Sequence, residues 1–169
     1  MDTPQVNATL DRLYRHMAWA NAKIHAQLGK APEEFLTLAA ENDEWTVATI
    51  LEHLVRAAGN YAAHLDGGSR PDNFGVPATQ DEIAHLAELC AGFDARLREA
   101  ALLPDAVTFR VRDGQTITRM RSTVLAQSIH HATEHRAQIA GILAMHGVNR
   151  IDLDAIDVWG LGDAEGLNE

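Results

Sequence analysis

The sequence predicts an all-α protein folded as a four-helix bundle, with a short β-hairpin or extended loop before the last helix. Apolar residues make up 46% of the chain but aromatics only 5%, so the helix formers Ala and Leu dominate. Four long segments repeat apolar residues at steps of three and four, the spacing of one helix face. A length of 169 residues suits one domain, so we expect residues 1–169 to share a single core.

The first expected helix spans Thr3–Leu28 and ends at Gly29, a residue type that often follows a helix. Its apolar face carries Val6, Leu10, Leu13, Met17, Ala20 and Ile24. The second expected helix begins after Thr46, whose hydroxyl is suited to capping a helix. Trp45 and Ile50 are spaced to pack against each other across that cap, as in a hydrophobic staple. This helix is expected to end near the loop-forming segment 66–77.

The third expected helix spans Gln80–Ala101, with Cys90 on its apolar face as a core residue. The next segment alternates β-branched and polar residues around Asp113-Gly114, a strong hairpin signal. The fourth expected helix spans Arg121–Met145. The remaining tail has four apolar residues expected to anchor it, and we expect it to fray after Gly160. These anchors are Ile151, Leu153, Ile156 and Trp159.

Composition narrows the class of function. The net charge of −10 argues against nucleic-acid binding, which requires a basic surface to neutralise phosphates. A single cysteine excludes an internal disulfide and fits a reducing compartment. No run of eighteen apolar residues and no apolar leader segment occurs, so we expect a soluble, cytoplasmic protein that does not bind membranes.

Three histidines lie on core-facing positions of two helices. His131 and His135 are four residues apart and therefore stack on one face of the last helix. His53 lies in the apolar stripe of the second helix. Buried imidazoles need partners, and a divalent metal satisfies three at once, whereas hydrogen bonds to backbone or carboxylates satisfy them singly. The spacing alone leaves both a metal site and a structural cluster of neutral histidines open.

The neighbouring polar residues are assigned more ordinary positions. His130 is turned toward the edge of the helix, and Gln138 lies near the face of the histidine pair. Glu134 and Arg136 are expected to be exposed helix charges. Among the remaining histidines, His16 and His85 are expected in solvent, His25 and His146 at helix ends, and His64 on the surface or at the mouth of a cavity.

Three segments carry a resemblance to a known family. "LYRHMAWANAKI", "WTVATILEHL" and "IHHATEHRAQIAGILAMHG" resemble the first helix, the first ligand segment and the closing His-x-x-x-His-Arg-x-Gln helix of the DinB/YfiT-like superfamily. The resemblance implies a four-helix bundle with an unusual connection order, often dimeric. It implies nickel or zinc bound by His53, His131 and His135, the residues that helical geometry also selects.

The same resemblance suggests an activity. Characterised relatives include transferases and isomerases that use low-molecular-weight bacterial thiols such as mycothiol or bacillithiol. A metal-dependent thiol S-transferase acting on a small molecule is therefore the leading hypothesis. Hydrolysis at the same three-histidine site and a non-enzymatic, stress-related metal-binding role are the alternatives.

Overall fold

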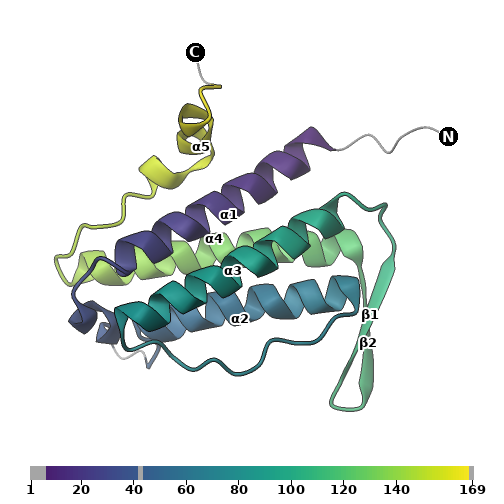
Figure 1. Cartoon of the computed structure of the whole chain (residues 1–169), viewed down its shortest axis with the longest axis horizontal. Coiled ribbons are helices and arrows are strands. Elements are labelled where there is room, and N and C mark those ends of the chain that lie inside the picture. Colours follow the sequence, from purple (N-terminus) through teal and green to yellow (C-terminus); the bar gives the residue numbers. More distant parts are fainter. Residues whose placement is uncertain (1–6, 42–43, 168–169) are drawn as a thin grey trace.

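The computed structural model describes residues 7–41 and 44–167, which contain four long helices and a two-stranded sheet (Figure 1). The long helices are α1 (Ala8–Leu28), α2 (Val47–Asp66), α3 (Gln80–Ala101) and α4 (Arg121–Met145). Short 3₁₀ helices span Glu33–Thr37 and Asp154–Ile156. The predicted helical bundle is confirmed, and α3 and α4 have the predicted bounds. The first helix begins at Ala8, where Asn7 caps it by accepting a hydrogen bond from Leu10 N, and not at Thr3 as expected; residues 3–6 lie outside the described residues.

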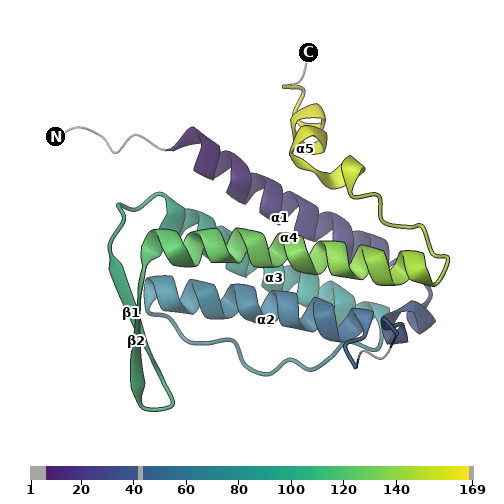
Figure 2. The same cartoon turned by 180° about the vertical axis from the view of Figure 1, so that it is seen from behind.

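The helices are not connected in simple up-and-down order. α1 packs against α3 and α4, and α2 packs against the same two helices from the other side. Segment 67–79 runs back along the bundle, so that α2 and α3 point the same way (Figures 1 and 2). This connection places α2 beside α4, which brings the segment carrying His53 against the segment carrying His131 and His135.

The returning segment is seated closely on the bundle. A Cβ atom at Gly59 would lie 2.8 Å from Pro71 Cγ and 2.9 Å from the ring of Phe93. Glycine at this position of α2 therefore allows Pro71 and Phe93 to pack directly on the helix backbone.

The segment before α4 is a hairpin, formed by β1 (Val107–Arg112) and β2 (Gln115–Met120). Asp113 and Gly114 have φ values of 51° and 75°, the left-handed conformations that a two-residue hairpin loop requires. Of the two forms predicted for this segment, the hairpin is the one present. Thr108 pairs with Arg119 and Arg110 with Ile117, so these four side chains share one face of the hairpin.

Two apolar clusters fill the bundle. One gathers Ile24, Leu51, Ile83 and Ile139, and the other gathers Tyr14, Met17, Leu97 and Leu125. Each such side chain contributes about 1.5–3 kcal/mol when it leaves water. Cys90 belongs to the first cluster, as predicted. No helix within the described ranges is long and apolar enough to span a membrane.

The tail does not fray at Gly160, contrary to the prediction. It continues as α5 (Val158–Ala164), which Asp157 caps by accepting a hydrogen bond from Gly160 N at 2.8 Å. Glu165 then forms ion pairs with Arg12 and Arg15 on α1. These long-range contacts, which no local pattern in the tail indicates, hold α5 on α1.

Two further expectations about this region are wrong. His16 is buried, because the tail covers it and its Nε2 bonds to the carbonyl of Ile156 at 2.9 Å. Trp159, which was expected to be an apolar anchor of the tail, is 76% exposed, whereas Ile156 and Leu161 are buried.

Candidate metal centre

The structure brings the three predicted histidines together between α2 and α4. His131 Nε2 lies 3.0 Å from His53 Nε2 and 3.1 Å from His135 Nε2. One possible ligand atom from each residue lies within 4.8 Å of the others, and no fourth His, Cys, Asp or Glu of the described chain joins the group. All three rings are partly buried. The pairing of α2 with α4 thus assembles a site from positions 78 residues apart in sequence.

The spacing of the nitrogens matches a metal site. Zinc binds imidazole nitrogen at about 2.0–2.1 Å, and tetrahedral angles then separate two ligand nitrogens by about 3.3–3.4 Å. The observed separations of 3.0 and 3.1 Å are close to this value. Two of the three nitrogen–nitrogen separations therefore already suit a shared divalent ion.

Protons alone satisfy this cluster poorly. His135 Nδ1 donates to Gln138 Oε1 at 2.9 Å, which leaves a lone pair on Nε2 of the neutral ring. Arg56 donates to His53 Nδ1 at 3.3 Å, which leaves the proton of neutral His53 on Nε2. His131 Nε2 faces both atoms. If it carries a proton, its N–H points at the N–H of His53. If it does not, its lone pair points at the lone pair of His135. One of the two short contacts is therefore unfavourable in either case.

A divalent cation removes the conflict, because it accepts a lone pair from each nitrogen. His53 must then carry its proton on Nδ1, and Arg56 must turn away. The Arg56 side chain is 44% exposed, so its Nη2 can turn from His53 toward solvent while its Nε keeps the pair with Glu52. The donor set of this chain therefore fits a bound metal.

The protonation of the cluster also favours metal binding. Burial, followed by the charges of His135 and His53, lowers the pKa of His131 to about 4. Burial and the proximity of His135 and Arg56 also lower the pKa of His53. Both rings are therefore neutral at pH 7, the form in which imidazole coordinates metals.

Two aromatic rings border the cluster. Trp45 lies edge-on to His53, with ring centroids 4.8 Å apart, and stacks near His135. Tyr61 meets His131 edge-on at 5.6 Å. The sequence indicated Trp45 only as a partner of Ile50, and its spacing from the cap held no sign of this second role. These rings limit the access of water to the ligand nitrogens.

Gln138 supports one ligand directly, as its predicted position suggested. Its Oε1 accepts from His135 Nδ1 and so fixes the tautomer whose Nε2 faces the cluster. We expect Gln138→Leu to weaken zinc binding about 10- to 100-fold. Competition with a chromogenic chelator measures this, and Glu134→Gln, an exposed change on the same helix, should leave affinity unaltered. Equal affinities of Gln138→Leu and wild type would contradict this role.

Arg136 is buried, contrary to the prediction that it is an exposed helix charge. Only 4% of its surface is accessible, and its Nη1 donates to Asn21 Oδ1 at 2.7 Å. Asn21 in turn donates to Asp94 Oδ2 at 2.9 Å, and Cys90 Sγ lies 3.7 Å from the same oxygen. The ligand helix is thus tied through its opposite face to α1 and α3.

Asp94 is the strained member of this network. It is 2% exposed, and its Oδ1 has no hydrogen-bond partner among the described residues. Burial raises the pKa of Asp94 to about 6, against the hydrogen bonds of Asn21 and Cys90 and the charge of Arg136. The folded protein therefore retains a proton there that the unfolded chain releases near pH 4.

We expect this proton to make stability depend on pH. Between about pH 4 and pH 6 the folded state binds more protons at Asp94, so stability falls as pH rises; outside this window the contribution is constant. The difference in unfolding free energy between wild type and Asp94→Asn should change by about 3 kcal/mol across that window. Urea titrations of the metal-free proteins measure it, and parallel pH curves would exclude the effect.

Of the other histidines, some are exposed as predicted and others are buried. His85, His130 and His146 are exposed, in keeping with their predicted positions. His25 is buried at 3% exposure and donates from Nδ1 to the carbonyl of Asn21, so its position near a helix end does not expose it. His64 is buried beneath the hairpin and bonds to Thr108 Oγ1 at 3.0 Å; it also borders two cavities.

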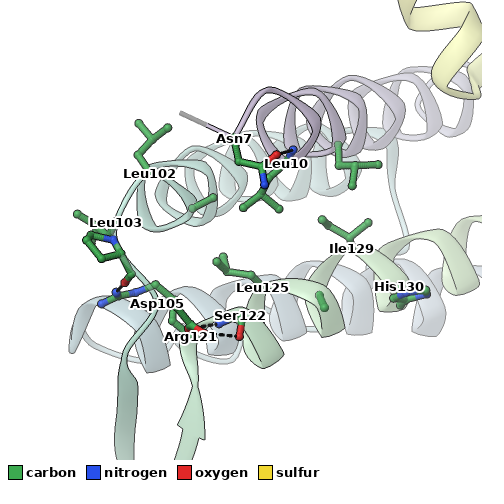
Figure 3. A pocket seen from close by; sticks show the side chains of 14 residues that line it. Asn7, Leu10, Leu102, Leu103, Asp105, Arg121, Ser122, Leu125, Ile129 and His130 are labelled. Carbon is green, nitrogen blue, oxygen red and sulfur yellow. Dashed lines mark hydrogen bonds between the residues drawn. The ribbon is translucent and has the colours of Figure 1, made fainter. Parts of the chain in front are cut away.

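A separate apolar cavity of about 540 Å³ lies between α1, the end of α3 and α4. Figure 3 shows Leu10 facing Leu125 and Ile129 across it, with His130 at one end. None of the three clustered histidines lines this cavity. It therefore lies apart from the candidate metal centre.

Comparison with known families gives a match that spans the three histidines. The model of the DinB family matches residues 4–159, which include all three histidines. No curated protein matches the chain significantly. Because the family match covers most of the sequence, the chain belongs to the DinB family.

Proposed function

We propose that this protein is a metal-dependent enzyme that transfers a low-molecular-weight thiol to an electrophilic small molecule, with zinc or nickel on His53, His131 and His135. One observation carries the proposal: three imidazole nitrogens converge with no fourth protein ligand among the described residues. Three protein ligands with one open position are typical of catalytic rather than structural sites.

The surroundings favour thiol chemistry over hydrolysis. A bound divalent ion would lower the pKa of a coordinated thiol and so supply a thiolate at neutral pH. Such a nucleophile needs no protein base, and no carboxylate of the described residues belongs to the histidine group. Glu52 is the nearby acid whose charge raises the pKa of His53, and its Oε1 accepts a hydrogen bond from Arg56 Nε at 2.8 Å. Hydrolysis, by contrast, gains from a free carboxylate that accepts a proton from water.

The chain's own residues contribute position and shelter. His131 and His135, one turn apart on α4, and His53 on α2 would hold the ion at the helix interface, where it would supply a thiolate. Trp45 and Tyr61 border this point and restrict water. The sulfur then forms a bond to the electrophilic carbon, while the leaving group departs with the electrons of the broken bond and the thiol proton passes to solvent.

The test is thiol consumption by the zinc- or nickel-loaded protein. Candidate thiols are incubated with monochlorobimane, whose chloride is displaced, and the fluorescent product is followed. Turnover that disappears in His131→Ala but persists in His130→Ala is expected. If no thiol reacts faster with the loaded protein than without it, the transferase proposal is wrong. Ester cleavage by the same loaded protein would instead support the hydrolase alternative.

A further inference from the structure

A second cavity adjoins the histidine cluster, between α2, α4 and the hairpin. It has a volume of about 340 Å³ and is lined by Tyr61, His64, Arg110, Ile117, Arg119 and Gln127, among others. Tyr61 forms part of its wall and also contacts the ring of His131. Gln127 lies one helical turn before His131, about 6 Å along α4. Tyr61 and α4 thus link the wall of this cavity with the surroundings of the histidine cluster.

The hairpin turns a cationic face toward this cavity. Arg110 pairs with Ile117 and Arg119 with Thr108, so the two arginines are diagonal neighbours on one face, about 7–8 Å apart at the backbone. Both line the cavity, and its lining includes no acidic residue of the described chain. Along β1 the residues of this face alternate with three apolar residues that are at least 65% exposed, namely Val107, Phe109 and Val111. The polar side of the strand thus faces the bundle and its apolar side faces solvent.

The local charge opposes that of the whole protein. Residues 107–120 contain three arginines and one aspartate, a net charge of +2, in a chain of net charge −10. The charges of Arg110 and Arg119 also reach the buried His64, whose pKa is lowered first by burial and then by Arg110. A carboxylate or phosphate placed between two guanidinium groups can accept charge-assisted hydrogen bonds from both.

We infer that this cavity binds the anionic part of the thiol cosubstrate, with a carboxylate held by Arg110 and Arg119 while the sulfur reaches the histidine cluster. The inference rests on the proposed function and specifies its substrate class: a thiol that carries a carboxylate. Tyr61 and Gln127 line this cavity, and Tyr61 also contacts the ring of His131. Guanidinium groups bind carboxylate and phosphate through the same paired hydrogen bonds, so both oxyanions enter the test.

The first experiment compares two thiols on cobalt-substituted protein, where thiolate coordination gives a near-ultraviolet charge-transfer band. Mercaptosuccinate carries two carboxylates, and 1-thioglycerol is of similar size without them. We expect mercaptosuccinate to bind about tenfold tighter to wild type, a difference of about 1.4 kcal/mol. The double variant Arg110→Gln/Arg119→Gln should lose this preference while keeping its cobalt content and its affinity for 1-thioglycerol.

Arg150→Gln is the matched control, since it removes one positive charge beyond the opposite end of α4. It should retain the preference. Equal affinity of wild type for the two thiols, or a preference that survives in the double variant, would overturn the inference.

The second experiment separates the anion site from the proposed metal chemistry. Metal-free protein is titrated with succinate, and separately with inorganic phosphate, while the Nε–H signals of Arg110 and Arg119 are followed by NMR. Saturable shifts in wild type are expected, and the tighter anion identifies the preferred group. If neither thiol coordinates cobalt, the proposed function fails alone and the titration still decides the site. Absence of saturable shifts with both anions overturns the inference.

Discussion

Wild-type protein loaded with zinc is expected to retain about one ion per chain after dialysis, and His131→Ala to retain almost none. His131 Nε2 is the central atom of the cluster, within 3.1 Å of both partners. Its loss leaves only two protein ligands, which is not enough for a tight site. His53→Ala and His135→Ala should also lose the ion. Elemental mass spectrometry of untagged protein measures the stoichiometry directly, because a histidine tag would bind metal itself.

The matched control for this experiment is the neighbouring residue. His130→Ala removes an imidazole from the same turn of α4 but from its exposed side, so metal content should be unchanged. Nickel loading provides an independent comparison with zinc. A His131→Ala protein that keeps a full complement of metal, or a folded wild type that takes up neither ion, would remove the basis for the site.

The second large effect is on stability. We expect Arg136→Met to lower the unfolding free energy by about 3 kcal/mol, since it leaves the buried Oδ1 of Asn21 without its donor and takes a compensating charge from the region of Asp94. Methionine retains much of the side-chain length, which limits the loss of packing. Urea denaturation of metal-free protein measures the change without a contribution from metal binding.

An exposed arginine gives the comparison for this measurement. Arg98 is 48% exposed and pairs with Asp11 at the surface, so Arg98→Met should cost about 1 kcal/mol or less. If the two substitutions destabilise equally, the buried network does not support the bundle. A smaller effect of Arg136→Met in the Asp94→Asn background would show that the two residues are energetically coupled.

The parts of the fold that follow from local sequence were predicted. Bounds of α3 and α4 and the Asp113-Gly114 turn depend on residues within a few positions of each other. The histidine cluster was also predictable, because helical spacing selected His131 and His135 and the apolar stripe of α2 selected His53. The pairing of α2 with α4 then brought them together.

What the sequence did not reveal depends on partners distant in sequence. Periodicity marks one buried face, yet α4 packs on α2 through its histidines and on α1 through Arg136, so a second face is also buried. His64 is covered only because the hairpin lies over α2, and His16 only because the tail lies over α1. A charged or imidazole side chain on such a face looks solvent-exposed until its covering segment is known.

The ion pairs of Glu165 with Arg12 and Arg15 affect the order in which the protein folds during synthesis. During synthesis α1 emerges first, but the segment that covers His16 and closes over this side of α1 follows only after α4. The newly made chain must therefore keep part of α1 uncovered until α5 has been made, a period in which exposed apolar surface is open to chaperones or to wrong partners. Folding of the bundle is thus expected to be followed by a separate docking of α5 on α1.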